Sequence, residues 1–90
     1  MTLLELARSG DLGALTERLD EITQGNFRRK GGGSLTDREQ LLIEARDYAR
    51  LGDLDEVTFR LRLYAEPKFS DVVECQMRYD QVMAARKVRP

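Results

Sequence analysis

Apolar residues recur along this chain at the spacing of an α-helix. Leu12, Leu15 and Leu19 follow the i, i+3, i+7 pattern that places side chains on one helix face. No stretch alternates apolar and polar residues with the period of two that marks a strand. Turn and capping residues divide the pattern into five predicted helices, over residues 2–9, 11–23, 36–51, 53–65 and 70–87. The sequence therefore predicts an all-α fold, a single domain over residues 1–90 built as a compact bundle of helices.

Capping chemistry sets the predicted helix ends. Three capping boxes, each a capping side chain three residues before an acid, are Thr2 with Glu5, Thr36 with Glu39, and Asp53 with Glu56. Asp11 and Ser70 are predicted to cap the remaining two helices. Gly10 and Gly52 stand where a left-handed C-terminal cap is needed, and Pro67 ends the fourth helix.

An internal repeat organises the chain. Residues 7–19 align with residues 49–61 at an offset of 42, and eight of the thirteen positions are identical. Each copy is predicted to be a helix, a tight Gly-Asp turn and an antiparallel helix, which gives hairpins over 2–23 and 36–66. A hairpin of this size does not bury its apolar face alone, so the two copies must pack on each other or on another surface.

Residues 42–61 of the second copy contain the small Ala45, the aromatic Tyr48 and Gly52 at the turn, and Leu54 and Val57 follow. This arrangement resembles a hairpin of the tetratricopeptide repeat family. Residues 3–12 of the first copy, with the sequence Leu-Leu-Glu-Leu-Ala-Arg-Ser-Gly-Asp-Leu, are similar to the opening hairpin of ankyrin arrays. Both resemblances imply a non-catalytic scaffold that binds another protein.

The two copies differ on one face. Phe59 and Leu63 of the second copy correspond to Glu17 and Glu21 of the first. A helix that is apolar on two sides is typical of one buried on two sides, so the second hairpin is predicted to be sandwiched. The last helix is the expected lid over Phe59 and Leu63, with a protein partner as the alternative. Its apolar stripe is Val72, Cys75, Tyr79, Val82 and Met83.

Other apolar residues leave the main helix faces. Ile43 lies among charged neighbours, and Val73 and Met77 fall outside the stripe of the last helix. Such residues mark association sites when they gather into a patch. A homodimer or a protein partner is therefore expected alongside the alternative of a monomer. Cys75 lies on the apolar stripe, which predicts a buried structural thiol.

Charge is balanced overall but uneven along the chain. The 15 Lys and Arg residues nearly offset 16 Asp and Glu residues, for a net charge of −1. Two acidic hairpins are separated by the basic segment 28–30 and followed by a basic tail. Residues 24–35, which include three consecutive glycines, are predicted to form a flexible loop, either native or an engineered linker.

Composition excludes several function classes. The chain has no His, so it has neither an imidazole base nor a His metal ligand. Its single Cys suits a reducing compartment, and we expect a cytoplasmic protein without a secretory signal or membrane span. The carboxylate pairs Glu17/Glu21 and Glu44/Asp47 are expected to be solvated, with ordinary pKa values. We therefore expect no enzymatic activity, cofactor or metal.

The sequence favours a protein-protein interaction module, acting as an adaptor, a chaperone-like subunit or an inhibitor. The candidate partner-binding residues are Ile43, Phe59, Leu63, Val73 and Met77, with Glu17 and Glu21 orienting basic partners. The alternative is a nucleic-acid-binding regulator, whose binding would weaken steeply with added salt. Its candidate residues are Arg28, Arg29, Lys30, Arg86, Lys87 and Arg89.

Overall fold

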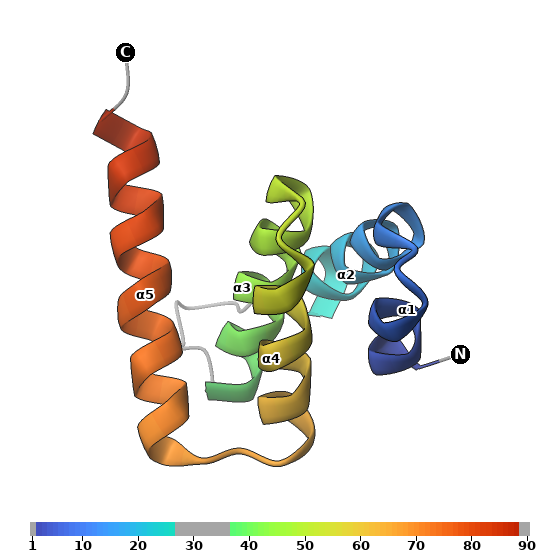
Figure 1. Cartoon of the computed structure of the whole chain (residues 1–90), viewed down its shortest axis with the longest axis horizontal. Coiled ribbons are helices and arrows are strands. Elements are labelled where there is room, and N and C mark those ends of the chain that lie inside the picture. The colour runs from blue at the N-terminus through green and yellow to red at the C-terminus, as the bar shows by residue number, and fades with distance from the viewer. Residues whose placement is uncertain (1, 27–36, 89–90) are drawn as a thin grey trace.

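The computed structural model describes residues 2–26 and 37–88, and these form helices joined by short turns, without a strand (Figure 1). The helices are α1 (Leu3–Ser9), α2 (Leu12–Asn26), α3 (Asp37–Leu51), α4 (Leu54–Ala65) and α5 (Phe69–Val88). The all-α bundle predicted from the apolar spacing is confirmed. The predicted loop begins too early, because α2 continues to Asn26, and the rest of that loop lies outside the described residues.

The two copies of the repeat build the same turn. Gly10 and Gly52 have φ values of 78° and 81°, in the left-handed region that favours glycine. The amide of Gly10 donates a hydrogen bond to the carbonyl of Ala7 at 3.2 Å, and the amide of Gly52 donates one to the carbonyl of Ala49 at 3.1 Å. The next residue in each copy caps the following helix: an Asp11 carboxylate oxygen accepts from Ala14 at 3.1 Å, and one of Asp53 accepts from Glu56 at 3.3 Å.

The capping predictions have mixed outcomes. Thr2 and Glu5 form the complete reciprocal box. Asp53 accepts from the Glu56 amide as predicted, but the Glu56 carboxylate turns to Arg60 and Arg78 instead of returning to the cap. The prediction for Ser70 is wrong, because α5 begins at Phe69 and places Ser70 in its first turn. Thr36 lies outside the described residues.

The second hairpin, formed by α3 and α4, is covered by other helices on two sides. Helices α1 and α2 pack on α4 and α3 respectively, and α5 packs on the same two helices from another side. The main core gathers Leu15 and Leu19 of α2, Tyr48 of α3, and Val57 and Leu61 of α4. A second cluster joins α5 to the hairpin, and its members are Leu41, Leu63, Val72 and Cys75. The predicted sandwich is thus confirmed, with α5 as the lid over Leu63, and Cys75 is buried as expected. The lid predicted over Phe59 is wrong, because Phe59 stays 37% exposed and takes no part in the cluster beneath α5.

Glycine substitutions test the turn geometry. We expect Gly52→Ala to lower the free energy of unfolding by about 1–2 kcal/mol, since an L-residue is strained in the left-handed region. Gly13→Ala is the matched control, because Gly13 lies within α2 and a Cβ there meets only Asp11 Oδ1, at 3.8 Å. Gly13→Ala is expected to raise stability by about 0.5–1 kcal/mol. Urea unfolding measures both, and equal effects of the same sign would contradict this account.

Candidate functional site

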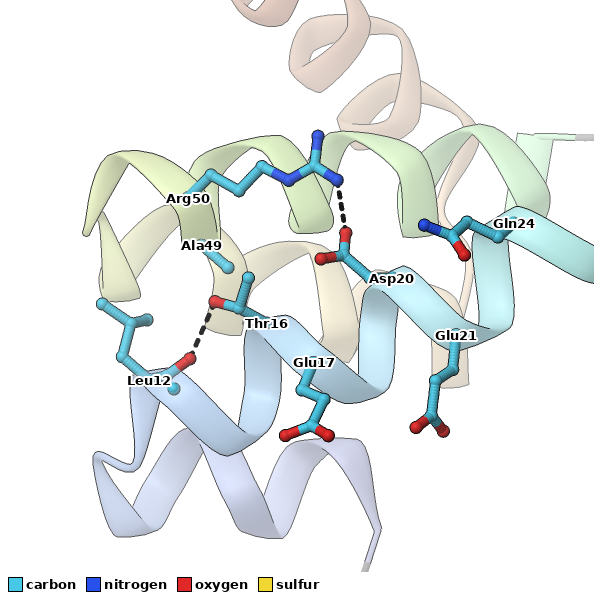
Figure 2. A pocket seen from close by; sticks show the side chains of 9 residues that line it. Leu12, Thr16, Glu17, Asp20, Glu21, Gln24, Ala49 and Arg50 are labelled. Carbon is cyan, nitrogen blue, oxygen red and sulfur yellow. Dashed lines mark hydrogen bonds and ion pairs between the residues drawn. The ribbon is translucent and has the colours of Figure 1, made fainter.

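An open groove of about 780 Å³ runs along the outer side of α2, beside the end of α3. Its charged lining comes from Glu17, Asp20 and Glu21 of α2 and from Arg50 of α3 (Figure 2). Asp20 points toward α3 and pairs with Arg50 at 2.5 Å, whereas Glu17 and Glu21 point away from α3. Arg50 therefore offsets one acid of the groove, and the two acids singled out from the sequence stay exposed on its rim.

This groove, which we call the α2 groove, can act on a ligand through its charges. It is open to solvent, and its acids can attract a basic ligand by charge. Within residues 2–26 and 37–88, no three side chains of the metal-binding types converge on a common point. No helix in the same part of the chain is long and apolar enough to cross a membrane.

The outward face of α5 carries a row of exposed apolar side chains. Phe69, Val73 and Met77 are 78%, 38% and 59% exposed, and their i, i+4, i+8 spacing places them on successive turns. Val72 and Cys75 of the same helix are buried, so the row lies away from α3 and α4. We call Phe69, Val73 and Met77 the α5 stripe.

Phe69 is the member of the stripe that the sequence pattern does not predict. The helix predicted over residues 70–87 begins at Ser70, which places Phe69 outside the helical spacing. Val72 donates its amide to the Lys68 carbonyl at 2.9 Å, which closes the first turn of α5 around Phe69. The signal was present in the sequence, since Phe69, Val73 and Met77 repeat every four residues.

The other predicted apolar anchors lie elsewhere. Leu63 is buried in the cluster beneath α5, so its side chain offers no surface to a partner. Phe59 is 37% exposed on α4, and Ile43 is half-buried on α3. The structure therefore joins Val73 and Met77 on one helix face and leaves Ile43 and Phe59 on two other helices.

The basic residues of the nucleic-acid hypothesis are described only in part. Arg86 is exposed on α5 and lines a depression of about 540 Å³ together with Asp47, Tyr79 and Asp80. The lining therefore includes two carboxylates beside the one guanidinium. Arg28, Arg29, Lys30 and Arg89 lie outside the described residues, as does the Lys87 side chain.

A buried arginine joins three helices beneath α5. The Arg60 side chain of α4 is fully buried, and its Nε donates to Glu44 of α3 at 2.9 Å. Its Nη1 donates to the Glu56 carboxylate at 2.5 Å, and its Nη2 donates to the Cys75 carbonyl of α5 at 3.0 Å. The guanidinium also lies 4.2 Å from the centre of the Tyr48 ring. We call these five residues the Arg60 cluster.

Hydrogen bonds beside the Arg60 cluster also attach α5 to α3 and α4. Arg78 of α5 donates to Glu56 at 2.7 Å and to Glu74 at 3.1 Å. The Tyr79 hydroxyl donates to Asp47 of α3, and burial together with this hydrogen bond raises the pKa of Tyr79. The helix that carries the α5 stripe is thus held by directional bonds as well as by apolar contact.

The expectation for Glu44 was wrong. Glu44 is not on a solvated helix face: it is 1% exposed, and burial raises the pKa of its carboxyl against the opposing effect of Arg60. Gln40 supplies a second hydrogen bond at 3.2 Å. The hydrogen bonds from Arg60 and Gln40 therefore offset only part of the cost of burying this carboxylate.

Comparisons with protein-family models, curated proteins and solved structures find no match for this chain.

Substitution of the buried arginine tests the cluster. We expect Arg60→Met to lower the free energy of unfolding by about 3–5 kcal/mol, because Glu44 stays buried without its partner. Arg18 is the equivalent residue of the first copy and is exposed, so Arg18→Met is expected to stay within about 0.5 kcal/mol of wild type. Thermal and urea unfolding measure the difference, and similar losses in the two variants would contradict the assignment.

The pH dependence of stability separates Glu44 from Glu56. The native pKa of Glu44 is raised from 4.5, so its contribution becomes more favourable as the pH falls from 7 toward 4.5. The two arginines lower the native pKa of Glu56, although its partial burial opposes them, so its contribution is lost as the pH falls below 4.5. Each pKa unit corresponds to about 1.4 kcal/mol.

The free energy of unfolding of Glu44→Gln and Glu56→Gln, measured from pH 7 to below pH 4.5, tests the direction of both pKa shifts. The advantage of wild type over Glu44→Gln should grow on acidification, and its advantage over Glu56→Gln should shrink. The same trend in both variants would refute the opposite shifts.

Proposed function

We propose that this chain is a non-catalytic protein-interaction module and that the outward face of α5 is its contact surface. The α5 stripe is the observation that carries the proposal. Single exposed apolar residues are ordinary on soluble proteins. Three on successive turns of one helix form a continuous apolar row, as expected of a face that another protein covers.

The two faces of α5 support this interpretation. One face is occupied by α3 and α4 through Val72 and Cys75, so the stripe is a second apolar face on the same helix. Helices that are apolar on two sides are typical of helices buried on two sides. Figure 1 places α5 at the edge of the bundle, with no described helix on its far side. Burial of one such side chain is worth about 1.5–3 kcal/mol, so a partner gains from covering all three.

The acidic side of α2 adds a steering role to the proposal. Glu17 and Glu21 are exposed on the rim of the α2 groove, and exposed charges change association rates more than they change affinity. We assign them the orientation of basic partners and assign the α5 stripe the main contact.

Site-specific photo-crosslinking tests the proposed surface. A benzophenone amino acid at Gln76, an exposed neighbour of Met77, is expected to yield discrete protein adducts in cells that produce the chain. The same amino acid at the exposed Arg62 of α4 is the control and should yield few.

The stripe itself is tested in the same cells. Phe69→Ser should reduce the adducts formed at Gln76 by up to about tenfold, since one lost contact of roughly 1.4 kcal/mol raises the dissociation constant by that factor. Phe69 is 78% exposed, so this variant is expected to fold as wild type does. Adducts that form equally at Gln76 and Arg62, or that persist in Phe69→Ser, would overturn the proposed surface.

A further inference from the structure

We propose that the occupant of the α5 stripe is a basic amphipathic helix of a partner protein; this inference rests on the proposed function. The stripe follows a row of i+4 residues over eight positions, or roughly 12 Å of helix axis at about 1.5 Å per residue. Rows of this kind pack into the grooves of another helix. A partner helix needs at least two turns, of about 5.4 Å each, to cover that length.

The charges beside the stripe define the partner. Glu74 flanks it on one side with a side chain that is 66% exposed, and Asp80 lies close to its C-terminal end and is also exposed. Glu74 forms an ion pair with Arg78, and Arg78 also forms an ion pair with Glu56. Asp80 makes no ion pair within the described part of the chain.

Of these two acids, Asp80 is therefore the one left for a positively charged side chain of the partner. Lys or Arg side chains on a docked helix would lay their aliphatic stems over Met77 and reach Asp80 with their charged ends. This arrangement uses both the apolar row and the acids that border it.

A second copy of this chain fits the surface less well. Paired α5 helices would bring the stripes together, but a parallel pair would place Glu74 and Asp80 near the same acids of the other copy, and an antiparallel pair would still place Glu74 near its own counterpart. Arg78 is already engaged by Glu56 and Glu74, so it is not available to offset them. Like charges across a contact oppose association, whereas a basic helix gains from the same two residues.

The α2 groove is the competing acidic surface. It carries more acids, but its apolar lining consists of Leu12, which is half-buried, Ala49, which is buried, and Gly13. It lacks the large exposed side chains that an amphipathic helix needs for its apolar face. A basic amphipathic helix is therefore expected on α5, because the α5 stripe matches its apolar face and the nearby acids match its basic face.

Peptide binding tests the inference. The probe is a fluorescent amphipathic helix of about 14 Leu and Lys residues, compared with a Leu and Glu peptide of identical pattern. Fluorescence anisotropy with the full chain should show binding of the Leu-Lys probe and weaker binding by about tenfold for Met77→Ser and for Asp80→Lys. Asp55→Asn, which removes an exposed acid of α4, is the matched control and should leave the affinity unchanged. Glu17→Gln, which removes an acid from the α2 groove, tests whether the probe binds there instead.

Each other outcome overturns the inference in a distinct way. Binding of the Leu-Glu probe but not the Leu-Lys probe would reject the basic partner and leave the proposed interaction surface intact. Loss of Leu-Lys binding in Glu17→Gln but not in Met77→Ser would move the site to α2. Sedimentation that shows a dimer broken by Met77→Ser would identify a second copy as the occupant. No binding of either probe, together with no adducts at Gln76 in cells, would reject the surface itself.

Discussion

The structure depends on one buried charge. Arg60 lies beneath α5 without solvent exposure, and its guanidinium is hydrogen-bonded to Glu44, Glu56 and the carbonyl of Cys75. A buried guanidinium is costly unless nearly all its donors find partners, so α3, α4 and α5 must be in place together. The apolar cluster between α5 and the hairpin is small, which gives these bonds a large share in the position of α5.

That position decides which residues meet solvent. With the Arg60 cluster formed, Val72 and Cys75 face the hairpin, and the α5 stripe faces outward. A rotation of α5 by one residue about its axis would move Val73 toward the core and break the bond to the Cys75 carbonyl. The same contact that stabilises the bundle therefore presents the proposed interaction surface, and it links the fold to the function we propose.

The sequence predicts the framework of the fold and misses its buried polar centre. The spacing of apolar residues and the glycines at positions 10 and 52 predict the helices and their turns. The repeat, however, equates Arg18 with Arg60, although the first is exposed and the second is fully buried. The difference arises from Glu44 and Cys75, which lie 16 and 15 residues away from Arg60 on other helices. Local patterns carry no such information, and for the same reason Glu44 was expected to be solvated.

Hydrogen exchange along the backbone tests the central claim most directly, because it reports the stability of α5 separately from that of α1–α4. In wild-type protein, α5 amides between Val72 and Val82 should be protected. In Arg60→Lys, which keeps the charge but loses the planar fork, protection should fall in α5 while α1 and α2 keep theirs. Uniform loss across all helices, or unchanged protection of α5, would contradict the role of Arg60 in holding this helix.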